Sequence, residues 1–276
     1  MNNILMKQKL EQFLLEDIGT NDLSATTIFP ISDIGSAVFQ AKETGTLAGL
    51  AIIQATYQLL DSDVHVTLFK KDGDDVITGE HIAKVTGPIQ TILTGERVIL
   101  NIIQRMSGIA TMTKQVVQRL NNSDIQVCDT RKTTPGLRMF EKYAVTCGGG
   151  YNHRYGLYDG VMIKDNHIAF CGSIEKAVQK AREQLGPMVK IEVETESKEE
   201  VEAAVQAGCD VIMFDNQSPE VIFEWNKLVP ETIITEASGN ITLENIASYR
   251  DCGVNCISLG SLTHSVSSLD ISLGGI

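Results

Sequence analysis

Short apolar runs alternate with helical stretches along the second half of the chain. Three successive runs end at Glu194, Asp215 and Glu236, each about 21 residues after the one before, which is the length of one strand and one helix. Apolar strands joined by helices are typical of a parallel sheet covered on both faces. The runs that we interpret as strands are 125–129, 160–164, 189–194, 210–215, 232–238 and 254–260.

Capping residues support the helices between these runs. Ser197 with Glu200 forms a capping box, and Ser218 is an N-cap followed by a proline at the first helical position. Each predicted strand ends in a polar or small residue, and α/β barrels build their active sites at the carboxyl ends of their strands. Since a full barrel has eight strands, either this barrel is incomplete or two weaker strands escape the pattern.

The first hundred residues follow a different pattern. Segments 36–49, 64–74 and 81–87 are interpreted as strands broken by turns, with a helix over 48–60 among them. A long helical region over residues 90–120 follows, and we expect it to break at a Ser-Gly pair, positions 107 and 108, which would mark a domain boundary. No long linker separates the halves, so we expect them to pack together.

Composition excludes several classes of partner. Of 276 residues, 43% are hydrophobic and 21% are charged, as in an ordinary globular protein. The net charge of −12 opposes binding to nucleic acids and anionic membranes. No run reaches the roughly 18 apolar residues of a membrane span, and the N-terminal segment lacks the core of a signal peptide. Six cysteines without a Cys-x-x-Cys pair are interpreted as reduced thiols. We expect a cytoplasmic location.

Positive charge is nevertheless concentrated in one segment. Residues 129–167 contain six Lys or Arg and two His in 39 positions. A solvated face is the usual fate of such residues, and we accept it for Lys142. Arg131 and Lys132 instead follow a predicted buried strand, and Lys164 ends another, so their side chains should point into the barrel mouth.

Two explanations remain for the residues in the mouth. Pairing with the four acids of the same segment would leave a surplus of two positive charges. An anionic ligand explains the surplus, because Arg matches carboxylates and phosphates bidentately and Lys adds a point charge. The sequence therefore favours a substrate with more than one carboxylate or phosphate.

Acidic residues end the neighbouring strands. Glu192 and Glu194 alternate along one strand and so share a face, while Asp215 and Glu236 end the next two. Several acids around a cationic mouth suggest metal or hydroxyl binding, and Mg²⁺ typically takes one or two carboxylates together with substrate phosphates. Glycine turns follow the last two strands, where barrels often bind phosphate, although glycine also simply ends strands.

Long motifs closely resemble the quinolinate phosphoribosyltransferases, also called carboxylating nicotinate-nucleotide pyrophosphorylases. The motifs are LLEDIGTNDLS, GERVILNIIQRMSGIAT, DTRKTTPGLRMFEKYAVTCGGGYNHRYGLYDGVMIKDNHI, IEVET, IMFDN, EASGNIT and ISLGSLTHSVSSLDISL. The resemblance runs from about residue 14 to 273. It implies an α/β fold, with an N-terminal α/β sandwich domain over 1–106 and an incomplete parallel α/β barrel over 107–265, and the tail 266–276 packing on the first domain.

The resemblance also implies an activity. Quinolinate and phosphoribosyl pyrophosphate would react with Mg²⁺ to give nicotinate mononucleotide, CO₂ and pyrophosphate, a step of NAD biosynthesis. The protein would be a homodimer in which each barrel mouth is completed by the N-terminal domain of the other subunit.

The implied roles fall on residues of the same motifs. Arg131, Lys132, His153, Arg154 and Lys164 would surround the quinolinate carboxylates, with Arg97 entering from the neighbouring subunit. Glu194 and Asp215 would hold Mg²⁺ and the ribose hydroxyls, and with Lys132 and Lys164 they form the expected catalytic set. The remaining substrate-binding residues are Thr130 and, around the 5′-phosphate, Ser238, Gly239, Asn240, Gly260 and Ser261.

One position departs from the family pattern. The family usually shows Ser-Gly-Gly in the phosphate turn, whereas Asn240 stands third here. Asparagine tolerates left-handed backbone better than most residues, so we expect phosphate binding to survive.

Four alternatives are weighed against these roles. Lys164 could form a Schiff base in an aldolase-type barrel, but its several Arg neighbours favour anion recognition. A binding protein without turnover would not need the acids Glu194 and Asp215. A related pyrophosphorylase, such as the molybdenum-operon relative, could use another acceptor. His153 could be a core histidine, although its place beside Arg154 favours a ligand role, and His167 is interpreted as a brace for Lys164 outside the site.

Overall fold

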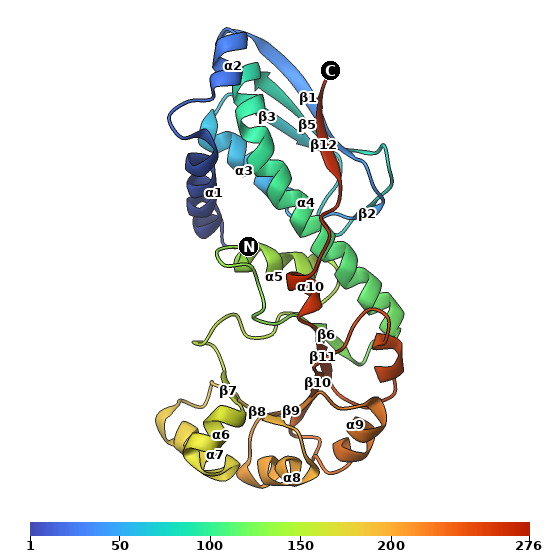
Figure 1. Ribbon diagram of the computed structural model, residues 1–276. Coiled ribbons are helices and arrows are strands. Elements are labelled where there is room, and N and C mark those ends of the chain that lie inside the picture. The colour runs from blue at the N-terminus through green and yellow to red at the C-terminus, as the bar shows by residue number, and fades with distance from the viewer. The chain divides into compact units, whose positions relative to one another are not determined.

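The computed structural model describes residues 1–276 and contains two compact units. Unit 1 comprises residues 1–114, 135–149 and 265–276, and unit 2 comprises residues 115–134 and 150–264 (Figure 1). This division by contacts is not contiguous in sequence, unlike the predicted domains 1–106 and 107–265.

Unit 1 is built on an antiparallel sheet of four strands in the order β12–β1–β5–β3. Its strands come from both ends of the chain, since β12 lies in the C-terminal tail and pairs with β1 (Figure 1). The elements of this unit are α1 (Asn3–Ile18), α2 (Leu23–Ile28), β1 (Ile34–Ala41), β2 (Gly45–Thr46), α3 (Ala51–Leu60), β3 (His65–Leu68), β4 (Asp75–Val76), β5 (His81–Pro88), most of α4 (Ile89–Leu120), α5 (Arg138–Cys147) and β12 (Ile271–Gly275).

Helix α4 runs without interruption, so the predicted break at Ser107 and Gly108 is wrong. These two residues instead let neighbouring segments of unit 1 pack closely against the helix. The Ser107 hydroxyl accepts a hydrogen bond from the Ala48 backbone N–H at 3.1 Å. A Cβ at Gly108 would lie 2.1 Å from the backbone oxygen of Ser267, so only glycine lets the C-terminal tail approach the helix here. The sequence alone does not separate a glycine that ends a helix from one that admits a neighbour.

The expectation that Lys142 is solvated is also wrong. Lys142 lies on α5 and is wholly buried, as is its neighbour Glu141, which forms an ion pair with Arg105 at 2.7 Å. Helix α5 buries more than one face, and the charged positions that a one-sided helix would expose are therefore enclosed.

Unit 2 contains the six parallel strands predicted from the sequence, in the order β6–β11–β10–β9–β8–β7. The first and last strands in sequence, β6 and β11, are neighbours, whereas β6 and β7 are the two edges of the sheet. The sheet is thus an incomplete barrel, which accounts for six strands where eight would close it. The strands are β6 (Gln126–Cys128), β7 (Val161–Ile163), β8 (Ile191–Thr195), β9 (Val211–Asp215), β10 (Ile234–Ser238) and β11 (Cys256–Ser258).

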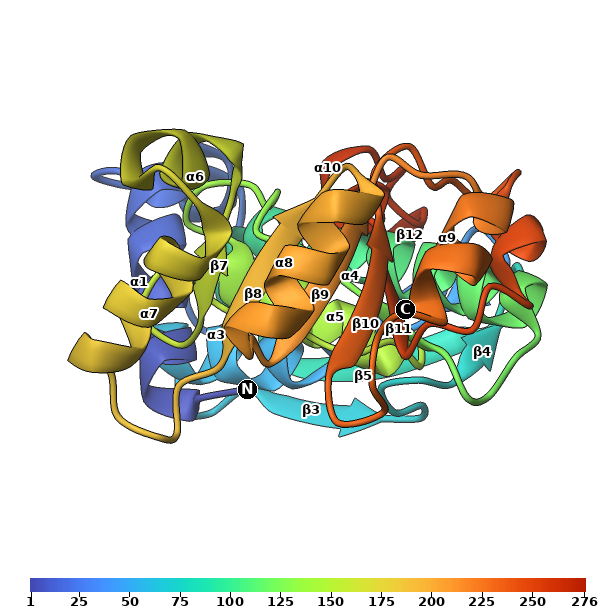
Figure 2. The ribbon, with the colours of Figure 1, turned by 90° about the horizontal axis from the view of Figure 1, so that it is seen from below.

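Helices cover the outer face of this sheet. Figures 1 and 2 show α6, α7, α8 and α9 along the outside of the strands that they connect. As predicted, Ser197 accepts a hydrogen bond from the Glu200 N–H and Ser218 caps the next helix. The second half of the predicted capping box is absent, because the Glu200 carboxylate accepts from the Glu196 N–H instead of the Ser197 N–H. The helical elements are α6 (Asp165–Cys171), α7 (Ile174–Gln184), α8 (Lys198–Ala207), α9 (Pro219–Asn226), the 3₁₀ turn η1 (Ile246–Tyr249) and α10 (Ser261–His264).

Register across the sheet sets the level of the strand-end residues. Glu194 of β8 pairs with Met213 of β9, which in turn pairs with Glu236 of β10. Paired residues of parallel strands point to the same face, so these three side chains emerge together on the inner face. None of the helices is long and apolar enough to cross a membrane.

Candidate active site

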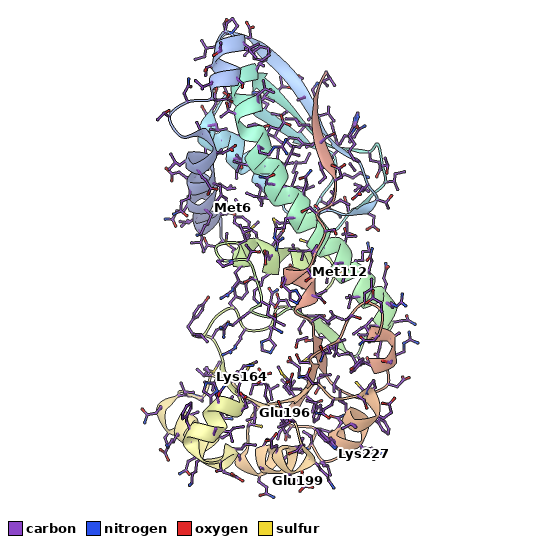
Figure 3. All side chains as sticks on the ribbon, in the orientation of Figure 1. Met6, Met112, Lys164, Glu196, Glu199 and Lys227 are labelled. Carbon is purple, nitrogen blue, oxygen red and sulfur yellow. The ribbon has the colours of Figure 1, made fainter.

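A cavity of about 570 Å³ lies at the carboxyl ends of the strands of unit 2. Lys164 and Glu196, labelled in Figure 3, are among the residues around it. Its lining is Thr130, Arg131, Lys132, His153, Arg154, Met162, Lys164, Asp165, Glu194, Glu196, Met213, Asp215, Asn216, Glu236, Ser238, Gly239, Asn240 and Ser258. The cavity is therefore walled almost entirely by polar and charged groups.

One wall of the cavity is basic. Arg131 and Arg154 both line it, and burial, followed by the charge of Arg131, lowers the pKa of the Arg154 guanidinium. Arg154 is anchored because its guanidinium donates to the Gly160 carbonyl at 2.8 Å. The backbone of Lys132 is fixed by the hydroxyls of Thr130, at 3.0 Å from its N–H, and Thr263, at 2.8 Å from its carbonyl. Two neighbouring cations held in place form a binding surface for an anion.

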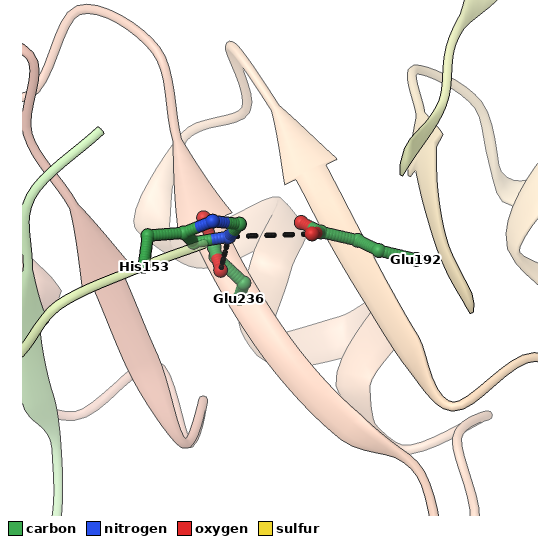
Figure 4. A group of neighbouring side chains, drawn as sticks. All are labelled: His153, Glu192 and Glu236. Atoms are coloured by element: carbon green, nitrogen blue, oxygen red, sulfur yellow. Dashed lines mark ion pairs between the residues drawn. The ribbon is translucent and has the colours of Figure 1, made fainter. Parts of the chain in front are cut away.

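His153 lies between two buried carboxylates at the floor of the cavity. Its Nε2 is 3.2 Å from a carboxylate oxygen of Glu192 and 3.2 Å from one of Glu236 (Figure 4). The backbone nitrogen of Arg154 lies 2.9 Å from Nδ1, and Nε2 faces the two carboxylates. The Ser258 hydroxyl donates to Glu236 from the next strand.

The cluster holds its proton tightly. Burial alone would lower the pKa of His153, but the hydrogen bonds to Glu192 and Glu236 outweigh it and raise that pKa to about 10. Burial raises the pKa of Glu192, because it disfavours the charged carboxylate. The cluster therefore titrates as one unit and keeps its proton at neutral pH.

Lys164 and Glu194 form an ion pair beside the basic wall. The backbone N–H of Lys164 donates to Nδ1 of His167 at 2.9 Å, which confirms His167 as a brace. The aldolase alternative needs a lysine that is activated by an apolar pocket or a neighbouring cation, whereas Lys164 is held in an ion pair with the carboxylate of Glu194.

Acidic residues line a second part of the cavity, which we call the acidic wall, and a glycine turn adjoins them. Glu194 and Asp215 lie on adjacent strands and both line the cavity. Beyond Asp215, the turn after β10 has Gly239 at φ +89° and Asn240 at φ +53°. A Cβ at Gly239 would lie 2.2 Å from the side-chain oxygen of Asn216, so this turn requires glycine.

Comparison with known proteins identifies the family. A model described as the quinolinate phosphoribosyl transferase C-terminal domain matches residues 109–274, and the model for the N-terminal domain matches residues 22–107. The chain belongs to the quinolinate phosphoribosyltransferase family.

Relatives of this phosphoribosyltransferase are similar along nearly the whole of this chain. A probable nicotinate-nucleotide pyrophosphorylase [carboxylating] of Bacillus subtilis is 56% identical, over 99% of this chain and 94% of that one. The chloroplastic nicotinate-nucleotide pyrophosphorylase [carboxylating] of Arabidopsis thaliana is 40% identical, over 97% of this chain and 82% of that one. The crystal structure of NadC from Streptococcus pyogenes is 42% identical, with a TM-score of 0.96 over 100% of this chain and 99% of that one.

Most of the residues predicted for the phosphoribosyltransferase site line one cavity. Three do not. Arg97 is exposed on α4 in unit 1. Gly260 and Ser261 follow β11 outside the lining, where a Cβ at Gly260 would lie 2.8 Å from Lys132 Cδ, and the buried Ser261 hydroxyl has no hydrogen-bond partner. The predicted residues that line the cavity are Thr130, Arg131, Lys132, His153, Arg154, Lys164, Glu194, Asp215, Ser238, Gly239 and Asn240.

Several lining residues were not assigned to the site from the sequence. They are Met162, Asp165, Glu196, Met213, Asn216, Glu236 and Ser258. Alternation along the strands would have found most of them. Met162 lies two residues before Lys164, Met213 two before Asp215, and Glu196 two after Glu194, so each shares the inner face with a residue that was predicted.

Proposed function

We propose that the cavity of unit 2 is where this chain performs the reaction of its family. That reaction transfers a phosphoribosyl group from phosphoribosyl pyrophosphate to quinolinate and gives nicotinate mononucleotide, CO₂ and pyrophosphate, a step of NAD biosynthesis. The observation that supports this proposal is that basic side chains and carboxylates from adjacent strands line one cavity. A dianionic acceptor fits the first, and a ribose that develops positive charge fits the second.

Quinolinate lies against the basic wall in this proposal. Arg131, Lys132 and Arg154 face its carboxylates, with Lys164 beside them. His153 lies beneath them, where Glu192 and Glu236 hold its imidazole in place. Neutralising the carboxylate that leaves would oppose its loss as CO₂. We therefore assign the stronger arginine contacts to the C3 carboxylate, which stays on the ring.

Mg²⁺ fits the acidic wall. Glu194 and Asp215 offer hard carboxylate oxygens on adjacent strands that face one cavity, the type of donor that Mg²⁺ prefers when it also binds substrate phosphates. The ion would neutralise charge on the departing pyrophosphate when bound. The same two acids also hold the ribose hydroxyls.

The 5′-phosphate lies at the turn after β10. Ser238, Gly239 and Asn240 offer hydroxyl and backbone N–H donors beside Asp215, and Gly260 with Ser261 begins the short helix that follows β11. The Ser261 hydroxyl has no hydrogen-bond partner, but it is buried outside the cavity lining. Thr130 completes the binding set between the two walls.

In this reaction the protein mainly positions the two substrates and stabilises the charges that develop. The pyridine nitrogen forms a bond to the anomeric carbon as the bond from that carbon to pyrophosphate breaks. Glu194 and Asp215 stabilise the positive charge that develops on the ribose. The pyridinium formed then accepts the electron pair of the bond to the C2 carboxylate, CO₂ leaves, and C2 takes a proton.

The working protein is a homodimer in this proposal. Arg97 of one copy is exposed on α4 and supplies a further positive group to the cavity of the other copy. Arg105 is less suited to that role because it pairs with the buried Glu141. We place the reaction in the cytoplasm, where neither a membrane nor a nucleic acid takes part.

An acceptor assay tests the proposed function. Enzyme, Mg²⁺ and phosphoribosyl pyrophosphate are incubated with quinolinate carrying label in its C2 carboxylate, or with nicotinic acid as the control acceptor. We expect labelled CO₂ and nicotinate mononucleotide in equal amounts from quinolinate, and little product from nicotinic acid. Equal turnover of both acceptors would contradict the decarboxylating assignment.

A further inference from the structure

Three residues other than glycine have left-handed backbone, and all three are asparagines. They are Asn121 at φ +48°, Asn216 at φ +56° and Asn240 at φ +53°. Such conformations are uncommon outside glycine. Asn121 follows the end of α4 and does not line the cavity, whereas Asn216 and Asn240 line it on neighbouring turns.

The side chains of Asn216 and Asn240 form a chain of hydrogen bonds that ends on Asp215. The Asn240 amide nitrogen donates to the Asn216 side-chain oxygen at 2.9 Å, and the Asn216 amide nitrogen donates to the Asp215 carboxylate at 2.7 Å. Because a carboxylate only accepts, it fixes the orientation of the Asn216 amide, and that amide in turn requires the nitrogen of Asn240. These hydrogen bonds therefore fix the orientation of both side-chain amides.

The backbone supports the same link. The Asn216 N–H donates to the Ser238 carbonyl at 2.8 Å, and the Asn245 side chain donates to the Asn240 carbonyl at 2.9 Å. Gly239 leaves the space that the Asn216 side chain occupies. The turn after β9 and the turn after β10 are therefore locked together at the point where each faces the cavity.

We propose that Asn240 is a positioning residue which acts through Asn216 to hold Asp215 at a fixed place relative to the turn 238–240. The inference rests on the proposed function, in which Asp215 and that turn bind opposite ends of one substrate, its metal-bound diphosphate and its 5′-phosphate. A ligand held at both ends gains affinity when the two contact groups are already aligned. A glycine at position 240 would bind the phosphate through its backbone but would leave the two turns linked only by the backbone hydrogen bond from Asn216 to Ser238.

Substitution by glycine tests the link without straining the backbone. Asn240→Gly and Asn216→Gly each remove one amide at a left-handed position that glycine accepts, and the double variant removes both. Asn121→Gly makes the same change, at the same type of backbone, away from the cavity. For each protein, kcat, the KM of both substrates and the Mg²⁺ concentration for half-maximal rate are measured.

The proposal makes three linked expectations. Asn240→Gly raises the KM for phosphoribosyl pyrophosphate and the Mg²⁺ requirement by roughly threefold to tenfold, the value of one hydrogen bond in the chain, while the KM for quinolinate stays unchanged. The double variant has the same KM for phosphoribosyl pyrophosphate and the same Mg²⁺ requirement as Asn216→Gly alone, because the two side chains act in series. Asn121→Gly matches the unsubstituted protein in all four quantities.

Other results would overturn the proposal. These are unchanged phosphoribosyl pyrophosphate and Mg²⁺ values in Asn240→Gly, or effects of Asn216→Gly and Asn240→Gly that multiply in the double variant. If the unsubstituted protein released no CO₂ from quinolinate, the proposed function would fail on its own. Calorimetry of phosphoribosyl pyrophosphate with Mg²⁺ would then decide the link, since Asn240→Gly must still weaken that binding. Equal binding by both proteins, or none by either, would reject it.

Discussion

At the scale of single residues, alternation along the strands explains which side chains meet in the cavity. Lys164 and Glu194 were predicted because a charged residue at the end of an apolar strand is conspicuous. Met162 and Met213 were missed because an apolar residue in an apolar strand is not, although each lies two positions before a predicted residue. The ring contacts of His153 also escape the sequence, since its two glutamates lie 39 and 83 positions away.

Lys132 provides the first prediction at this scale. Lys132→Ala removes an exposed cation from the basic wall without disturbing a packed core. We expect kcat/KM for quinolinate to fall by roughly 30-fold or more, because losing one partner of a desolvated charged contact costs about 2–5 kcal/mol. Steady-state kinetics measures the loss, and a thermal melt checks that the fold is intact.

A matched lysine serves as its control. Lys227 is exposed, forms an ion pair with the exposed Glu224 three residues before it, and lies over the ring of the exposed Phe223. Surface substitutions of this type change stability and activity little, so Lys227→Ala should keep kcat/KM within about twofold. Unaltered kinetics in Lys132→Ala, or equal losses in both variants, would mean that the basic wall does not bind the substrate.

The His153 cluster predicts how stability depends on pH. Because hydrogen bonds to Glu192 and Glu236 raise the folded pKa of His153 to about 10, its stabilisation is complete below the unfolded pKa near 6.5. That stabilisation is then lost as pH rises toward the folded value. We expect the free energy of unfolding to fall by roughly 1–3 kcal/mol between pH 7 and pH 9.

Comparison with His153→Gln isolates this contribution. The variant lacks the titrating imidazole, while the buried cysteines and tyrosines titrate equally in both proteins. Denaturant unfolding should therefore give a flatter pH dependence for His153→Gln over the same range. Parallel curves for the two proteins would show that the cluster does not hold a proton at neutral pH.

At the scale of elements, the six strands of unit 2 were predictable because each is a short apolar run between capped helices. Helix α4 was predicted in extent but not in continuity. Its Ser107 and Gly108 are ordinary helix-ending residues by local preference, and only the packing of the tail against them explains why the helix continues. The expectation that Lys142 is solvated failed for the same reason, because burial of a whole helix depends on partners distant in sequence.

Gly108 gives a prediction at this scale with two opposing effects. Alanine is a better helix former than glycine by about 1 kcal/mol, so a free helix would gain from Gly108→Ala. The new Cβ would meet the Ser267 backbone oxygen at 2.1 Å, and overpacking against backbone costs about 1–3 kcal/mol or more. We expect the clash to dominate and the melting temperature to fall by several degrees.

Gly186→Ala is the corresponding control. A Cβ at Gly186 meets nothing within 4 Å, and its backbone is not left-handed. Its melting temperature should match that of the unsubstituted protein or exceed it slightly. A more stable Gly108→Ala would contradict the close approach of the tail to α4.

At the scale of the whole molecule, the net charge of −12 and the basic cavity are compatible because they act over different distances. Salt screens charges beyond about 8 Å at physiological ionic strength, so a bound anion responds mainly to the residues around it. Four of the six Lys or Arg in residues 129–167 line the cavity and suffice to bind an anion in an acidic protein, namely Arg131, Lys132, Arg154 and Lys164.

The proposed homodimer predicts complementation between inactive variants. If Arg97 serves the cavity of the other copy, Arg97→Ala and Lys132→Ala damage opposite halves of the shared site. Mixing the two with subunit exchange should restore about a quarter of normal activity, because half of the dimers are mixed and each has one intact site of two. No recovery, with exchange verified by differently tagged subunits, would place Arg97 outside the site.

The measurement that tests the central claim most directly is a crystal structure of the complex with quinolinate. The account predicts quinolinate inside the cavity of unit 2, with its carboxylates on Arg131 and Arg154 and its ring nitrogen facing Glu194 and Asp215. Quinolinate bound elsewhere, or a bound pose in which these arginines point away from it, would contradict the account.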